Sequence, residues 1–214
     1  MISMTSYHAR LGAFILLAAS ACSGADTPTA KPAAKPAATA KAAPAPAATA
    51  TRYVQAKGGS LAFAFMQAGA VNTGAFRQFA TELQYDANRL AASSLKVTVQ
   101  IASLDTQDKD RDAEILGADL FDAKKYPTAQ FVASSFAKGA NGGVEAVGKL
   151  TLRGVTRDLR LPLSIQSIAN GVELSGETTI RRLEYGVGQG DYKSTEWVGD
   201  EVKLQYKVPL AKAG

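Results

Sequence analysis

The chain has 214 residues, with 24 lysines and arginines, 19 aspartates and glutamates, one cysteine and one histidine. His8 and Cys22 both lie near the N-terminus, in a region interpreted below as an export signal and its cleavage point. The folded part therefore contains neither residue type, which excludes Ser-His-Asp and Cys-His catalytic sites, zinc sites of cysteine and histidine, and intrachain disulfides. Carboxylate chemistry or binding remains, and we expect a binding protein rather than an enzyme.

Residues 1–21 predict a secretory signal, because Arg10 is followed by an apolar run that is too short to span a bilayer. The sequence Ala19-Ser20-Ala21-Cys22 is similar to a bacterial lipoprotein box, in which the cysteine is acylated and becomes the new N-terminus. This similarity implies lipidation of Cys22 and a periplasmic protein anchored to a membrane; Ser23 favours the outer membrane. The same bond also suits ordinary signal cleavage, which would leave a secreted protein with a free cysteine.

Residues 22–51 predict a tether, because they are almost entirely Ala, Pro, Thr and Lys without a periodic apolar pattern. At about 3.1 Å per residue, an extended segment of this length reaches up to roughly 90 Å. The part that follows, 52–214, holds 20 basic and 18 acidic residues. This near balance of charge argues against a nucleic-acid surface.

Residues 52–214 suit one domain with a single core, and their apolar residues recur with period two. Such rows are typical of antiparallel strands that have one buried face and one wet face. We expect about eight strands on this basis, at 60–67, 76–86, 95–101, 129–137, 143–153, 159–165, 171–183 and 202–208. Pro162 cannot donate a backbone hydrogen bond, so we expect it at a strand edge or a bulge.

Only residues 108–118 predict a helix. Asp108 would lie near the positive N-terminal end of the helix dipole, Ile115 and Leu116 would face the core, and Gly117 would end the helix.

Strands with one apolar face each cannot hide that face as an open sheet, which favours a closed barrel or a sandwich. An eight-stranded barrel has an interior that side chains either just fill or leave open for one small ligand. Small residues such as Ala129, Ala133, Ala146 and Gly148 share rows with large apolar ones, which favours unfilled volume but also suits a filled core. We predict an all-β fold, an antiparallel eight-stranded barrel with one short helix.

Several short segments occur in order along the domain: Ser103-Leu104-Asp105-Thr106, Leu120-Phe121-Asp122, Gly148-Lys149-Leu150-Thr151-Leu152, Arg182-Leu183-Glu184-Tyr185-Gly186 and Val198-Gly199-Asp200-Glu201. Their order and spacing over about 53–210 resemble the YceI-like, polyisoprenoid-binding family of bacterial periplasmic proteins. The resemblance implies a lipocalin-like barrel around a long apolar chain, such as a polyisoprenoid, an isoprenoid quinone or a fatty amide. Many relatives carry histidines in or beside the first strand, whereas 59–67 has none. The resemblance therefore does not indicate which polar head group the ligand carries.

The inward rows supply the predicted ligand-binding walls: Phe63, Phe65, Phe76, Phe79, Val97, Val99, Ile101, Leu116, Phe121, Phe131, Leu150, Leu152, Leu161, Leu163, Ile165 and Ile180. We predict that the protein binds or carries a long-chain apolar lipid in the periplasm, with no cofactor, metal or nucleic acid. The sequence leaves a homodimer open. The alternative is a structural or stress-related interaction module whose bound lipid is not transported.

Two patterns are assigned to local structure rather than to ligands. The acidic residues of 108–119 are spaced as in a calcium loop, but Ala113 replaces the glycine of the sharp turn, which favours a charged helix start. The glycines at 186, 188 and 190 predict a turn or bulge, because no Gly-Lys-Ser/Thr follows them.

Two groups of charged residues also receive structural interpretations. Asp105, Asp112 and Asp122 are the candidates for carboxylate catalysis, but we expect them to fix the structure around the predicted helix. Arg181 and Arg182 are expected to be solvated or paired surface charges.

Overall fold

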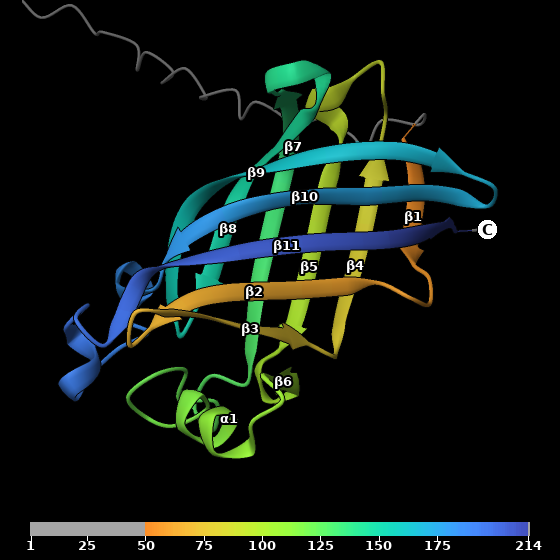
Figure 1. Cartoon of the computed structure of the whole chain (residues 1–214). Coiled ribbons are helices and arrows are strands. Elements are labelled where there is room, and N and C mark those ends of the chain that lie inside the picture. The colour runs from red at the N-terminus through yellow and green to blue at the C-terminus, as the bar shows by residue number, and fades with distance from the viewer. Residues whose placement is uncertain (1–49, 214) are drawn as a thin grey trace, which may run out of the picture. The chain divides into compact units, whose positions relative to one another are not determined.

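Eight strands close into an antiparallel barrel in the computed structural model, which describes residues 50–213 (Figure 1). Around the ring they are β1 (Thr51–Gln55), β4 (Phe79–Tyr85), β5 (Ser94–Gln100), β7 (Thr128–Lys138), β8 (Val144–Leu152), β9 (Val155–Ile168), β10 (Gly171–Arg181) and β11 (Val198–Lys212). Pairing of β1 with β11 closes the ring. The predicted all-β barrel with one short helix is confirmed.

Three further strands extend the wall at one end of the barrel: β2 (Ser60–Gln67), β3 (Ala70–Phe76) and β6 (Leu104–Asp105). The long strand β11 pairs with β1 through residues 210–212 and with β2 through residues 198–207. Strand β3 pairs with β2, and β6 pairs with β3. β1 and β2 therefore lie one after the other along the same edge of β11.

The single strand predicted over 76–86 is wrong. The backbone N–H groups of Arg77 and Gln78 donate hydrogen bonds to Ser103 rather than to a neighbouring strand. Phe76 therefore ends β3, and Phe79 begins β4.

The N-terminal part of the predicted domain organisation is only partly visible in the fold. Thr51, the last residue of the predicted tether, begins β1. The predicted export signal, Cys22 and the tether up to residue 49 lie outside the described residues.

The helix α1 (Lys109–Ile115) begins where the sequence predicts it, because the Asp108 carboxylate accepts hydrogen bonds from the backbone N–H groups of Asp110 and Arg111. The helix-start interpretation of these acidic residues is confirmed. Ile115 packs against the core. Short 3-10 turns are η1 (Leu90–Ala92), η2 (Ile101–Ser103), η3 (Ala140–Gly142), η4 (Arg182–Tyr185) and η5 (Gly190–Lys193). Within residues 50–213, no helix has the length and hydrophobicity that crossing a membrane requires.

The ladder between β9 and β10 covers only part of the two strands. It joins residues 164–168 of β9 to residues 171–175 of β10 and stops before Pro162. Proline has no N–H group to donate to a neighbouring strand. From Pro162 back to Val155, β9 is therefore paired with β8 but not with β10 in the described ladders, which leaves a seam in the barrel wall.

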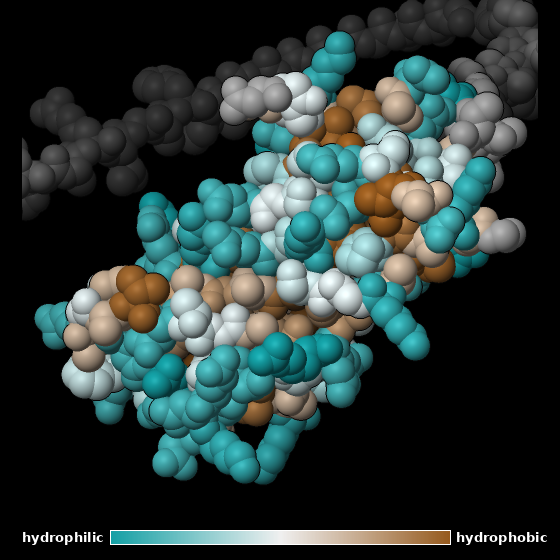
Figure 2. Space-filling view, turned by 45° about the vertical axis from the view of Figure 1, so that its right-hand side comes forward, coloured by the Kyte–Doolittle hydropathy of each residue, from teal (hydrophilic) through white to brown (hydrophobic). Residues whose placement is uncertain are grey.

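Two clusters of buried side chains occupy the barrel interior. The first is built around Leu83, Leu95, Phe131, Leu163 and Leu210, and the second around Phe63, Phe76, Ile101, Leu152 and Tyr185. The outer face shown in Figure 2 is mostly hydrophilic, with scattered apolar side chains. The barrel wall thus has apolar side chains on its inner face and mostly polar ones on its outer face, as the period-two rows predict.

Candidate functional site

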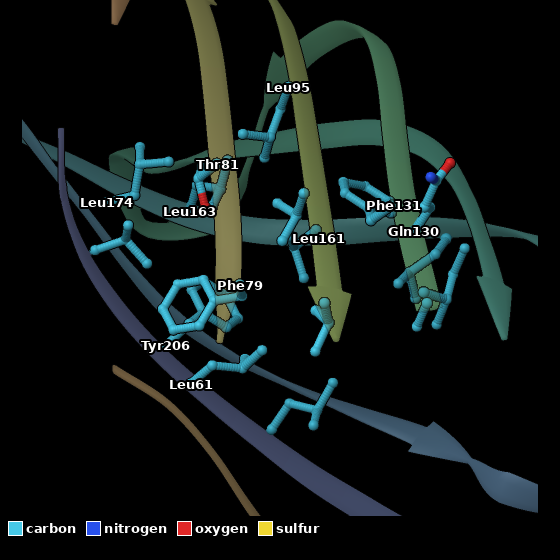
Figure 3. Close-up of a pocket in the computed structure, with 17 residues that line it drawn as sticks. Leu61, Phe79, Thr81, Leu95, Gln130, Phe131, Leu161, Leu163, Leu174 and Tyr206 are labelled. Carbon is cyan, nitrogen blue, oxygen red and sulfur yellow. The ribbon is translucent and has the colours of Figure 1, made fainter. Parts of the chain in front are cut away.

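A first cavity of about 110 Å³ lies inside the barrel, mainly among side chains of the first core cluster (Figure 3). Seven of the predicted ligand-binding residues line it: Phe79, Val97, Val99, Phe131, Leu150, Leu161 and Leu163. Strands β2, β10 and β11 complete its wall through Leu61, Leu174 and Leu204. Because nearly all of these side chains are hydrocarbon, the cavity suits an apolar ligand rather than a polar one.

A second cavity of about 80 Å³ lies within the second core cluster. Five predicted residues line it: Phe63, Phe65, Phe121, Leu152 and Ile180. Helix α1 contributes Arg111, Glu114 and Ile115 to the same wall. This cavity therefore has charged side chains in its wall, whereas the first cavity has none.

The remaining four predicted residues are not among those that line these two cavities. Phe76 packs between aromatic neighbours, with ring centroids 5.3 Å from Phe63 and 6.3 Å from Phe121. Ile101 is buried in the second cluster, and Leu116 packs against it. Ile165 packs against the first cluster. Contact with a ligand remains a prediction for all sixteen residues.

The two cavities lie end to end along shared strands. On β8, Leu150 lines the first cavity and Leu152 lines the second. The same step of two residues separates the cavities on β11, from Leu204 to Val202. Two residues along a strand span roughly 6–7 Å, so the two cavities are only one side-chain layer apart. A single extended chain could therefore occupy both cavities once the side chains between them shift.

A contact between α1 and η5 crosses the rim of the second cavity. The hydroxyl of Tyr192 donates a hydrogen bond to Glu114 Oε1, and both residues line the cavity. This hydrogen bond, together with burial and the neighbouring carboxylates of Glu114, Asp119 and Asp191, raises the pKa of Tyr192 to about 12. The hydrogen bond between Tyr192 and Glu114, called the latch below, thus links α1 to η5.

Arg182 is buried, so the prediction that it is a surface charge is wrong. Its guanidinium group donates five hydrogen bonds to the backbone carbonyls of Val187, Tyr192, Ser194, Val198 and Gly199. The reason is a change of conformation, since β10 ends at Arg181 and the turn η4 begins at Arg182. Arg182 holds residues 187–199 in place over the second cavity. The glycines at 186, 188 and 190 have positive φ angles, as the predicted turn requires.

Two of the candidate acids take part in local structure. The Asp105 carboxylate accepts hydrogen bonds from the backbone N–H of Gln107 and from the Arg77 guanidinium, which lower the pKa of Asp105. Asp112 Oδ1 accepts hydrogen bonds from the backbone N–H and the hydroxyl of Thr106. These contacts tie β6 to its neighbours and agree with the structural interpretation of both residues.

The sequence predicted 12 of the 32 residues that line the two cavities and missed the other 20. Several missed residues are apolar members of the predicted rows, such as Leu61, Leu95, Leu159 and Leu204, and the alternation itself was the signal that could have found them. The polar members, such as Thr81, Glu114 and Tyr192, interrupt the apolar pattern or lie in loops, so no periodic signal marks them.

Comparison with known sequences finds a family match over most of the domain. Residues 53–210 match a family model described as YceI-like domain. A UPF0312 protein of Vibrio cholerae is 42% identical over 86 residues, which are 40% of this chain and 46% of the relative. The matched region thus spans about half the length of the first curated relatives.

Comparison with solved structures finds the same barrel. The crystal structure of Burkholderia cenocepacia BcnA is 30% identical and has a TM-score of 0.68, covering 72% of this chain and 96% of BcnA. A polyisoprenoid binding domain from Saccharophagus degradans, implicated in plant cell wall breakdown, has a TM-score of 0.62 at 14% identity. That alignment covers 77% of this chain and 99% of the Saccharophagus domain, and at this identity it shows a shared fold.

Proposed function

The chain belongs to the YceI-like domain family, and from this premise we propose that it binds one long-chain apolar lipid along the barrel interior. The observation that carries the proposal is the pair of cavities that lie end to end on the same strands and are lined mainly by hydrocarbon side chains. The ligand class is a polyisoprenoid, an isoprenoid quinone or a fatty amide. The polyisoprenoid binding domain of Saccharophagus degradans, which shares the fold, supports this choice.

The physical need for such a protein is the insolubility of the ligand. Burying apolar carbon is worth about 0.8 kcal/mol per methylene group, so a polyprenyl chain does not cross water unaided. A bilayer offers the same gain, however. The net preference of the lipid for the protein must therefore come from the fit of the chain and from polar contacts at specific points, not from gross hydrophobicity.

Periplasmic carriage on a lipid anchor is the second part of the proposal. Acylation of Cys22 and the tether of 22–51 would keep the barrel within reach of the membrane that stores its ligand. The similarity of Ala19-Ser20-Ala21-Cys22 to a lipoprotein box supports this part.

Blocking the interior tests the proposal. Leu161 lines the first cavity and faces Ala146 of β8, so a Leu161→Trp substitution should fill the cavity. The control is Val132→Trp on β7, because Val132 is 48% exposed on the outer face. Transfer of a radiolabelled polyprenol from phosphatidylcholine vesicles should fall by about tenfold or more in Leu161→Trp and remain unchanged in the control. Equal transfer in wild type and Leu161→Trp would contradict binding in the interior.

A second candidate function is a structural module that retains its lipid. It is favoured by the two contacts that close the interior, Tyr192 to Glu114 at the rim and Tyr206 to Pro162 at the seam. Exchange of bound radiolabelled lipid with unlabelled vesicles separates the two functions. Exchange within minutes supports a carrier, and retention over the lifetime of the folded protein supports the structural module.

A further inference from the structure

Two buried oxygen atoms in the barrel wall have no hydrogen-bond partner among the described residues: Gln55 Oε1 on β1 and Thr81 Oγ1 on β4. Thr81 is only 3% exposed and lines the first cavity, where Figure 3 shows it among the lining side chains. Burying a polar group without a hydrogen bond destabilises the folded state. An apolar residue would serve a packed wall better than Thr81 does.

The two oxygen-bearing side chains lie on neighbouring strands, β1 and β4, near the end of their shared ladder. Val54 of β1 lies opposite Glu82 of β4. The ladder ends at this pair, and the same register continued by one residue would set Gln55 opposite Thr81. Gln55 also pairs with Leu210, a fully buried residue of β11. Gln55 and Thr81 therefore form a small polar spot on a mostly apolar inner wall.

The Gln55 amide also lies near two side chains that line the cavity. Gln55 Nε2, Phe79 Cζ and Val208 Cγ1 all lie within 3.5 Å of the position that a Cβ atom at Gly59 would take. Phe79 and Val208 belong to the cavity wall. The polar spot is thus next to the space that the proposed ligand would occupy.

Charge narrows the chemistry of a group that could bind there. The side chains that line the first cavity are apolar except for Thr81, Gln130 and Tyr206, and none of them carries a charge at neutral pH. A phosphate or carboxylate would lose its hydration in this cavity without gaining a cationic partner. The polar spot therefore suits a neutral group.

We propose that Thr81 and Gln55 form the subsite for the polar group of the ligand, and that this group is a neutral hydroxyl or carboxamide. This inference rests on the proposed lipid-binding function. Gln55 Oε1 can only accept a hydrogen bond, so the ligand group must donate one, whereas the Thr81 hydroxyl can donate or accept. An alcohol, a phenol or a primary amide meets both demands, whereas a quinone and a phosphate ester do not. The chain would then extend from the first cavity toward the second.

Three ligands with one branched chain test the chemistry: phytol, a neutral alcohol, phytane, a hydrocarbon, and phytanic acid, an anion at neutral pH. Binding to the delipidated full chain is measured by competition with a radiolabelled polyprenol. We expect phytol to bind about five- to tenfold more tightly than phytane or phytanic acid, as one or two buried hydrogen bonds allow.

The near-isosteric variant Thr81→Val tests the residue. It should remove the preference for phytol, leave phytane binding unchanged, and raise the melting temperature of the lipid-free protein, because the unpaired hydroxyl is gone. Thr98→Val, on the outward row of β5, is the matched control and should keep the preference. Thr81→Ser retains the hydroxyl and should also keep the preference.

The outcomes separate this inference from the function on which it rests. If Thr81→Val binds phytol as wild type does, or if it weakens phytol and phytane equally, the subsite is wrong and lipid binding stands. If Thr81→Val does not fold, phytol and phytane binding are compared in Gln55→Met instead. This variant removes the accepting oxygen at the end of β1 and should also remove the preference for phytol. If none of the three ligands and no polyprenol binds the wild type, the proposed function itself fails.

Discussion

The hydroxyl of Tyr206 on β11 donates a hydrogen bond to the carbonyl oxygen of Pro162 on β9, across the intervening strand β10. Gly176 of β10, which pairs with Tyr206, makes this contact possible. A Cβ atom at Gly176 would lie 2.5 Å from the Pro162 oxygen and 2.6 Å from the Tyr206 hydroxyl. The Tyr206 side chain thus closes the seam where Pro162 ends the β9–β10 ladder.

Removal of this hydroxyl should loosen the seam. We expect Tyr206→Phe to lower the free energy of unfolding by about 1 kcal/mol, because the Pro162 carbonyl loses its partner and the ring still packs. Chemical denaturation measures the loss, and amide hydrogen exchange should become faster in residues 155–162 of β9.

Gly176→Ala provides the complementary change, because its Cβ atom would displace both the hydroxyl and the carbonyl. It should destabilise the barrel more than Tyr206→Phe does. Wild-type stability and wild-type exchange in both variants would show that the contact does not close the seam.

The latch at Tyr192 should have a signature at alkaline pH. Its folded-state pKa is raised from 10.0 to about 12, so the folded protein holds the phenol proton to higher pH than the unfolded chain does. The stability that the Tyr192–Glu114 hydrogen bond adds to the folded state is therefore fully present below pH 10 and is lost as the pH rises to about 12. Wild type should be more stable than Tyr192→Phe at neutral pH, and the difference should shrink across this window.

Denaturation midpoints of the two proteins at a series of pH values measure that difference. Other groups titrate in both proteins, so their effects cancel in the comparison. A stability difference that stays constant up to pH 12 would show that Glu114 does not raise the pKa of Tyr192.

Arg182→Lys should release the loop over the second cavity. All five N–H donors of the Arg182 guanidinium bind backbone carbonyls, whereas a lysine ammonium has only three N–H donors. At least two carbonyls therefore lose their partner. We expect a loss of about 3 kcal/mol or more in the free energy of unfolding. Hydrogen exchange should show the largest change in residues 187–199, and uniform change over the whole barrel would contradict the local role.

Period-two alternation was sufficient to predict most of the barrel, because each wall strand has one wet face. It failed at β1 and β3 for a specific reason. β1 (Thr51–Gln55) alternates poorly and adjoins the Ala/Pro-rich tether, and β3 (Ala70–Phe76) consists mostly of small and polar residues. The break at Arg77 and Gln78 depends on hydrogen bonds to Ser103, which is distant in sequence. No local pattern records such a contact.

The candidate site was predictable to the extent that it is apolar. Residues such as Leu150 and Leu161 follow from the inward rows and line the first cavity. Thr81 lies in an inward row between Phe79 and Leu83, but a polar residue in an apolar row gives no sign of whether its hydroxyl is paired. Only the three-dimensional arrangement shows that it is not.

Cys22→Ser tests the predicted lipid anchor. Labelling of cells with a radioactive fatty-acid precursor should mark the wild-type protein and not the variant, because only a cysteine at this position can be acylated as in a lipoprotein box. The variant should also move from the membrane fraction to the soluble periplasmic fraction. Persistence of the label or of membrane association in Cys22→Ser would overturn the anchor.

Native mass spectrometry of the protein purified from its own host, followed by organic extraction, tests most directly whether the barrel binds a lipid. We expect a mass excess that corresponds to one long-chain neutral lipid, that disappears on extraction, and that returns after incubation with polyprenol-containing vesicles. A protein that shows the same mass before extraction, after extraction and after incubation with those vesicles would contradict a lipid-binding barrel.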